Sequence, residues 1–245
     1  MFKQSKTSTG KIEKDHPFYS LIQRAYHVFK QAPTEHGVCN CCMYPEIRND
    51  FFNHDQENLP FDYLRDWFFA AADIPLNKSS WRFVLPRTLE TLASGQDPSS
   101  TGIEVSLNRF ETGNPENWSS QEWAILDEFQ RLYLDQANLI YDDFLDDVIC
   151  MFATAGWKAE NLFTQILEWP TEKIVNKFWH DWCNCRNPSI WITAFWDDES
   201  IPMKFYTSKQ LIDRISNYAL DENTPMELSN KAAEVSDLML SPSRY

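Results

Sequence analysis

The sequence predicts an all-α protein, a single irregular array of about ten helices in an α-solenoid-like stack or an orthogonal bundle. Three observations favour this fold class. Only 6 of the 245 residues are glycine, and no Asn-Gly or Asp-Gly pair separates alternating apolar runs, so hairpin signals are lacking. Between the 13 prolines, apolar residues recur at helical spacing. The hydrophobic share of 43% is enough for a packed core.

The domain organisation follows from composition and from helix-start signals. The polar, lysine-rich residues 1–15 predict a flexible N-terminal arm, and residues 16–245 predict one helical domain. Prolines suited to a first helical turn mark the early helix starts. These starts are Pro17, Pro45, Pro60 and Pro86, and Gly95 closes the last of these helices. The polar stretch 96–116 is the best place for a domain boundary, although continuous packing across it is favoured.

The longest proline-free stretch, residues 116–169, predicts three consecutive helices. Ser119 and Glu122 have the spacing of a capping box, in which each side chain accepts a hydrogen bond from the other residue's backbone N–H. A second helix is predicted from Asp142 and ends before Gly156, whose position suits a left-handed C′ residue. A third is predicted over about 158–168.

The last third of the chain predicts four more helices. Thr171 and Ser208 are suitable N-caps, and Thr224 precedes a proline at the first helical position. Pro188 predicts a short additional helix that is rich in aromatic residues.

The net charge of −14 restricts the partners of the chain. Binding to nucleic acid through phosphates needs a basic surface, so we expect none. A basic protein partner is favoured, although acidity that serves only solubility explains the same charge. No segment has the roughly 18 consecutive apolar residues of a membrane span, and the N-terminus lacks the apolar core of a secretory leader. We therefore expect no membrane partner and a cytoplasmic protein.

Cysteine and histidine residues form one pattern, H-x-x-C-N-C, at two distant places, and Cys42 adds a further thiol to the first. Thiolate and imidazole are the usual ligands of zinc, so two loops that met could hold one tetrahedral ion. The C-x-C spacing departs from that of common zinc loops, and buried thiols that fill space between helix ends are the alternative. The candidate zinc ligands are His36, Cys39, Cys41, Cys42, His180, Cys183 and Cys185.

Acidic residues gather at two places, at 142–147 and 197–199. The first has the spacing of the aspartate-rich motif that holds Mg²⁺ in helical prenyl-diphosphate enzymes. However, the sequence has no basic pocket for a diphosphate, and the helix macrodipole accounts for acids at a helix start. The same acids, beside two tryptophans that we expect to be partly exposed, are candidates for a protein interface. The candidate partner-binding residues are Asp142, Asp143, Asp146, Asp147, Trp191, Trp196, Asp197, Asp198 and Glu199.

Three segments together resemble an uncharacterised bacterial family of helical proteins. They are a Cys-containing loop at Cys39-Asn-Cys41-Cys42, the helix segment Leu85-Pro86-Arg87-Thr88-Leu89-Glu90, and the pattern Trp118-x-x-x-Glu122. The resemblance covers residues 36–185. It implies a helical bacterial cytoplasmic protein and carries over no catalytic residue.

The sequence leaves three hypotheses of function. The first is an acidic protein that neutralises a basic partner, such as the immunity protein of a bacterial toxin, because negative potential speeds binding to a basic target. The second is a zinc-binding Cys/His protein with a regulatory or enzymatic role, and the third is a helical scaffold. The chain has no nucleophile elbow, no zinc-protease motif and no phosphate loop. Whether it is an enzyme stays open, and the absence of these motifs argues against it.

Overall fold

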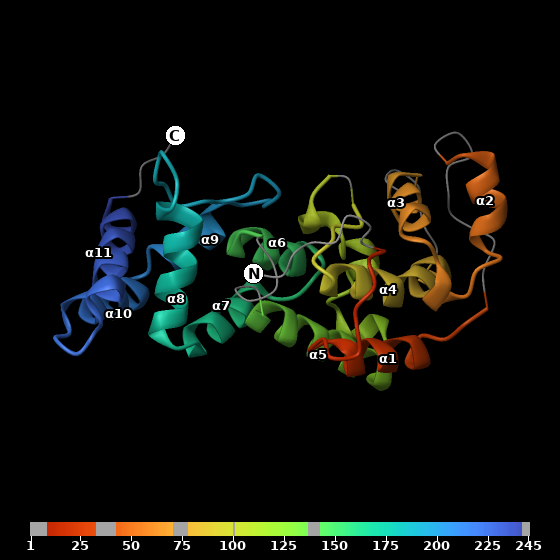
Figure 1. Ribbon diagram of the computed structural model, residues 1–245, viewed down its shortest axis with the longest axis horizontal. Helices are drawn as coiled ribbons and strands as arrows, with labels where there is room; N and C mark the ends of the chain where they lie inside the picture. Colours follow the sequence, from red (N-terminus) through yellow and green to blue (C-terminus); the bar gives the residue numbers. More distant parts are fainter. Residues whose placement is uncertain (1–8, 33–42, 71–77, 100, 137–142, 242–245) are drawn as a thin grey trace. The chain divides into compact units, whose positions relative to one another are not determined.

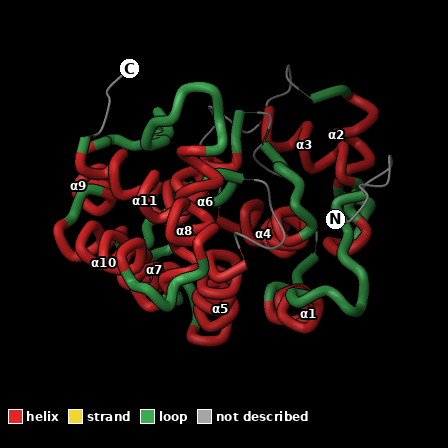
Figure 2. Tube along the Cα trace, turned by 60° about the vertical axis from the view of Figure 1, so that its left-hand side comes forward, coloured by secondary structure: helices red, strands yellow, loops and turns green. Residues whose placement is uncertain are grey.

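The computed structural model describes residues 9–32, 43–70, 78–99, 101–136 and 143–241. Within these ranges the chain forms helices joined by turns and loops, with no β-strand, which confirms the predicted all-α class (Figure 2). The contacts of the chain fall into two compact units. The N-terminal unit holds Met1–Gln136 with Thr154–Gly156, and the C-terminal unit holds Ala137–Ala153 with Trp157–Tyr245.

The N-terminal unit is built around helix α4 (Figure 1). Helices α1 and α3 pack against α4, and α1 also packs against α5. Short 3₁₀ turns connect several of these helices. The helices are α1 (Tyr19–Val28), α2 (Pro45–Phe51), α3 (Phe61–Ala70), α4 (Lys78–Ala93) and α5 (Ser120–Gln136), and the 3₁₀ turns are η1 (Gln56–Asn58), η2 (Ile103–Val105), η3 (Arg109–Glu111) and η4 (Pro115–Asn117).

Helix α4 runs through Pro86, so the predicted helix start at this proline is wrong. Proline has no N–H to donate to the carbonyl four residues earlier, which here belongs to Arg82. The buried amide of Gln56 supplies a donor instead. Its Nε2 lies 3.4 Å from the Arg82 oxygen and 2.9 Å from the oxygen of Phe83. A side chain from η1 therefore allows the helix to pass the proline, and from Ser80 to Ala93 every α4 side chain except that of Arg82 is buried.

Arg87 of α4 holds the first described residues of the chain against the core. Its guanidinium donates to the carbonyl oxygens of Thr9 and Gly10, both at 2.5 Å, and to that of Leu59 at 2.9 Å. Glu90, one turn further, accepts from Arg87 at 3.1 Å and lies 2.9 Å from Lys11 Nζ. These bonds fix residues 9–11 of the segment that was predicted as an arm, whereas residues 1–8 lie outside the described chain.

Two local signals in the N-terminal unit are confirmed. The Ser119 N–H donates to Glu122 Oε2 at 2.9 Å, and the Glu122 N–H donates to Ser119 Oγ at 3.3 Å, which is the predicted capping box of α5. Gly95 has a φ of 75° and follows α4 as its left-handed terminator. The helices predicted near Pro17, Pro45 and Pro60 are also present, as α1, α2 and α3.

In the C-terminal unit, α10 and α11 lie side by side and α8 packs against both (Figure 1). Arg214 of α10 donates to the carbonyl oxygens of Leu167 and Trp169, at 2.7 and 2.5 Å, and so caps the end of α7. The elements are α6 (Leu145–Thr154, of which Thr154 belongs to the N-terminal unit), α7 (Ala159–Glu168), α8 (Thr171–Phe178), the π-helical turn η5 (Trp179–Cys183), α9 (Ser200–Tyr206), α10 (Lys209–Leu220) and α11 (Met226–Leu240).

Three predictions in this unit need correction or restriction. The aromatic helix predicted from Pro188 is wrong, because residues 188–199 form a loop, and α9, which follows it, was not predicted. Thr171 and Thr224 are not the N-caps of α8 and α11, since Pro170 and Pro225 occupy those positions and no side chain caps either helix. The described part of α6 begins at Leu145, and Asp142 lies outside the described residues. The predicted starts at Thr171 and Ser208 agree with α8 and α10.

None of the helices in the described ranges is both long enough and apolar enough to cross a lipid bilayer.

Candidate functional site

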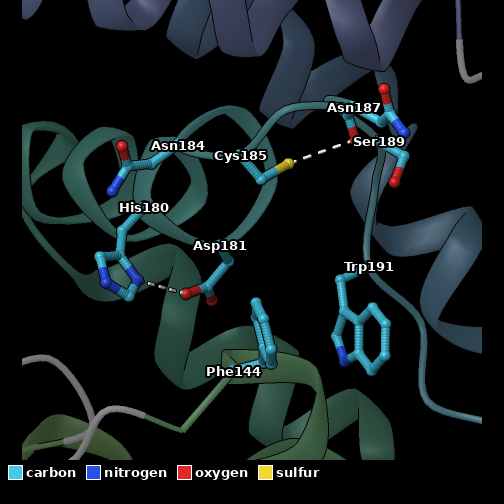
Figure 3. A pocket seen from close by; sticks show the side chains of 8 residues that line it. All are labelled: Phe144, His180, Asp181, Asn184, Cys185, Asn187, Ser189 and Trp191. Atoms are coloured by element: carbon cyan, nitrogen blue, oxygen red, sulfur yellow. Dashed lines mark hydrogen bonds and ion pairs between the residues drawn. The ribbon is translucent and has the colours of Figure 1, made fainter.

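The C-terminal unit contains a pocket of about 580 Å³ beside the π-helical turn η5 (Figure 3). Its side chains come from three segments and ring the opening. The lining residues are Phe144 from the segment before α6, His180 and Asp181 from η5, and Asn184, Cys185, Asn187, Ser189 and Trp191 from the loop after η5.

The turn η5 extends α8 and widens it. The Asn184 N–H donates to the carbonyl oxygen of Trp179 at 2.9 Å, five residues earlier, instead of the usual four. Such turns are rare and often occur at functional sites, because they change the direction in which side chains leave a helix. Here the turn carries the exposed His180 and the buried Asp181 into the wall of the pocket.

Asp181 fixes the turn to the neighbouring helix. One carboxylate oxygen accepts from the N–H of Leu145, at the start of α6, at 2.9 Å. The other lies 2.8 Å from Lys177 Nζ and 3.0 Å from His180 Nδ1. Lys177, itself buried, also donates to the carbonyl oxygen of Asp143 at 2.7 Å. The base of the pocket is therefore held by a buried ion pair that spans α8, η5 and the segment before α6.

Asp146 fixes the loop of residues 188–199. Its carboxylate is 2% exposed and accepts from the Thr193 N–H at 2.8 Å, from Trp196 Nε1 at 3.0 Å and from the Tyr206 hydroxyl at 3.0 Å. Burial raises the pKa of Tyr206 well above its usual range, and the charges of Asp146, Asp181 and Asp147 raise it further. Three carboxylates thus act electrostatically on one phenol, which indicates a negative potential in this part of the unit.

The first predicted acidic cluster is divided by these contacts. Asp142 lies outside the described residues, and Asp143 is half-buried. Asp146 is buried, so it supports the surface from beneath and, contrary to the prediction, is not available as a partner-binding residue. Asp147 is half-buried and accepts from Trp191 Nε1 at 2.9 Å.

The second predicted cluster lies on the surface, where Asp197, Asp198 and Glu199 are exposed. The Asp198 carboxylate accepts from the Ser200 N–H at 2.9 Å at the start of α9. Hydrogen bonds from Ser200 lower the pKa of Asp198, so it is ionised at neutral pH.

Aromatic side chains reach the surface on the same loop. Trp191 is 41% exposed and Phe195 is 37% exposed, whereas Trp196 is half-buried with its indole N–H bonded to Asp146. The Trp191 ring stacks on Phe144 at a centroid distance of 4.9 Å and an angle of 26°. The prediction that Trp191 and Trp196 are partly exposed is confirmed.

The predicted zinc ligands of the first loop, His36, Cys39, Cys41 and Cys42, lie outside the described residues. In the second loop, Cys183 and Cys185 are free thiols. Burial raises the pKa of Cys183 to about 12, with the charges of Glu234 and Cys185 acting in the same direction, so this thiol is protonated at neutral pH. Within the described ranges, no group of three or more His, Cys, Asp or Glu residues is placed to hold a metal ion. Zinc shared between the two loops stays a prediction.

Sequence reasoning missed most of the pocket. Phe144, Asn187 and Ser189 belong to no motif, and nothing in the sequence marks η5 as a π-helical turn. One available signal was the density of aromatic residues after Pro188, which we interpreted as a helix.

No protein-family model, curated protein or solved structure matches this chain. The resemblance to a bacterial helical family therefore stays an expectation, and the argument for function rests on the site itself.

Proposed function

We propose that this chain is a binding protein for a basic protein partner and that it acts as the immunity protein of a bacterial toxin. The observation that carries the proposal is the loop 188–199, which presents exposed aromatic side chains next to exposed acids. Large aromatic residues with a polar rim are the usual composition of an energetic hot spot in a protein interface.

The loop is held in place before any partner arrives. Asp146 accepts hydrogen bonds from Thr193, Trp196 and Tyr206, so the backbone between Trp191 and Trp196 is tied to α6 and α9. A surface that is already ordered loses less conformational entropy on binding, and this favours affinity.

The charge supports a basic partner. Asp197, Asp198 and Glu199 are exposed directly after the aromatic residues, and the whole chain carries a net charge of −14. Asp198 also caps α9, so part of this acidity has a structural explanation. Negative potential around an interface chiefly raises the association rate with a positive partner. An immunity protein of this kind acts in the cytoplasm of the producing bacterium.

The test has a biochemical and a genetic part. The immobilised protein is exposed to a lysate of the source bacterium, and the captured protein is purified for binding kinetics at several salt concentrations. Raising salt from about 50 to 300 mM should slow association far more than dissociation. Separately, this chain is expressed with the product of the neighbouring gene, and growth is measured.

Matched variants locate the surface. The double variant W191A/F195A and the double charge reversal D197K/E199K should each weaken binding. The controls are M226A, which removes an exposed apolar side chain outside the loop, and E222K, which reverses an exposed acid outside it. If all four variants bind the partner equally well, the loop is not the binding surface and the proposal fails. It also fails if no basic partner is captured and growth is not rescued.

A further inference from the structure

We propose that the pocket beside Trp191 binds the guanidinium group of an arginine side chain supplied by the basic partner. The inference deepens the proposed function and rests on it, since it names the group of the partner that the site recognises. The pocket, at about 580 Å³, is large enough for one such side chain.

The aromatic wall fits a planar cation. Phe144 and Trp191 are stacked with their rings at 26° and line one side of the pocket (Figure 3). Guanidinium stacks on indole and phenyl faces, because its flat, delocalised charge is attracted by the ring quadrupole and is weakly hydrated. A lysine ammonium is more strongly hydrated and matches this wall less well.

The charge around the wall has the required sign. Asp147 accepts from the Trp191 indole N–H at 2.9 Å, so a carboxylate lies at the edge of the ring that would stack on the cation. Asp147 itself is not among the lining residues, whereas Asp181 lines the pocket with its charge balanced by Lys177. Arg186 belongs to the same loop but is not among the lining residues.

The rest of the rim offers acceptors. Asn184 and Asn187 carry side-chain amide oxygens and Ser189 carries a hydroxyl, all on the loop that faces the aromatic wall in Figure 3. The Cys185 thiol donates to the carbonyl oxygen of Asn187 at 3.2 Å and steadies this loop. Guanidinium has five N–H donors in one plane, so it can use several of these acceptors while its face stays on Trp191.

The inference is tested with small probes on the complete chain. Nα-acetyl-arginine amide is titrated into ¹⁵N-labelled protein, and the indole N–H signal of Trp191 is followed by NMR. The lysine and citrulline derivatives are titrated in parallel, because the first keeps the charge without the plane and the second keeps the plane without the charge. We expect saturable binding of the arginine derivative in the millimolar range and at least about threefold weaker binding of the other two. No shift up to about 50 mM, or equal binding of citrulline, overturns the inference.

Three variants separate the pocket from the wider surface. In the variants the backbone amide signal of Ser189, which also lines the pocket, is followed, because W191A has no indole N–H at this position. W191A should weaken binding of the arginine derivative about fivefold, and D147N, which keeps an acceptor for the indole N–H but loses the charge, about threefold. F195A is the control, because Phe195 is exposed on the same loop and does not line the pocket. If W191A or D147N binds the probe as the wild type does, the pocket is not the site.

The two proposals fail differently. If W191A and F195A both lose partner binding but the arginine derivative does not bind, the proposed partner surface is supported. The pocket is then not an arginine site. Binding of the probe that depends on Trp191, without any basic partner, keeps the guanidinium site and removes the proposed function.

Discussion

Each unit of the chain buries one carboxylate against a tyrosine, and the two carboxylates are satisfied in different ways. In the N-terminal unit, Glu90 accepts from the Tyr26 hydroxyl at 2.6 Å and pairs with Arg87 and Lys11. In the C-terminal unit, Asp146 accepts from the Tyr206 hydroxyl and from two N–H groups of the loop 188–199. The first carboxylate pairs with a buried guanidinium, and the second accepts from a phenol, a backbone N–H and an indole N–H.

The difference matches what each carboxylate organises. Glu90 and Arg87 lie on the central helix α4 and hold residues 9–11 against it, so both charges lie inside the core. Asp146 orders a surface loop by accepting from the Thr193 N–H and from the Trp196 indole N–H. The ion pair of Glu90 therefore stabilises the interior, whereas the hydrogen bonds to Asp146 order a loop that stays on the surface.

The largest expected effect comes from removing the buried cation. Arg87 is 1% exposed, and R87M leaves Glu90 without its nearest guanidinium and three carbonyl oxygens without their donor. Breaking a buried ion pair from one side should lower the free energy of unfolding by about 3–5 kcal/mol. Equilibrium urea unfolding measures it, with R24M as the control because Arg24 forms an exposed pair with Glu128. A loss under about 1 kcal/mol would show that the network is not stabilising.

Removing the Asp146 carboxylate should lower the free energy of unfolding slightly less, and it should also loosen the loop of residues 188–199. D146A leaves three buried or half-buried donors without their acceptor, and we expect a loss of about 3 kcal/mol in urea unfolding. The amide of Thr193 should also exchange faster with deuterium, because its hydrogen bond is gone. D197A, an exposed acid on the same loop, should change stability by less than about 0.5 kcal/mol. Unchanged exchange at Thr193 would contradict the assigned role.

Alkaline pH separates the two tyrosines. Burial, followed by the charge of Glu90, raises the pKa of Tyr26, while Arg87 acts in the opposite direction; burial, followed by Asp146, raises the pKa of Tyr206. A tyrosine whose pKa is higher in the folded state than in the unfolded state contributes its full stabilisation at any pH below the unfolded-state pKa of about 10. This stabilisation is lost as pH rises through the folded-state pKa.

The expected result is a smaller alkaline loss of stability in Y206F than in the wild type, by up to about 1.4 kcal/mol per pH unit above pH 10. Y26F should reduce the loss less, because a guanidinium already favours the ionised form of Tyr26. Urea midpoints at pH 9, 10 and 11 test this, and equal behaviour of both variants would remove the distinction between the two carboxylates.

The smallest effect concerns helix starts, which also differ between the units. S119A strips the capping hydroxyl from α5 and should cost about 1 kcal/mol. T224A should cost less than about 0.5 kcal/mol, because the N-cap of α11 is Pro225 and no side chain caps that helix. Thermal or urea melts of both variants measure the contrast, and equal losses would mean that Thr224 caps α11 in solution.

The candidate site was predictable only in part. The partial exposure of Trp191 was predicted, and the acids 197–199 were named as candidates, but which acidic cluster is exposed was decided by the structure. The pocket was not predictable, because its walls come from Phe144 and from residues 180–191, which no spacing rule connects.

The sequence by itself determined the all-α class and most helix starts, including the capping box at Ser119, because those signals act over one helical turn. Tertiary structure alone decided two other features. Helix α4 continues through Pro86 because the Gln56 amide, far away in sequence, donates to the carbonyl that proline leaves open. Residues 188–199 stay a loop because Asp146 accepts the Thr193 N–H and the Trp196 indole. In both cases a backbone group takes a distant side chain as its partner, and the local pattern contains no trace of that partner.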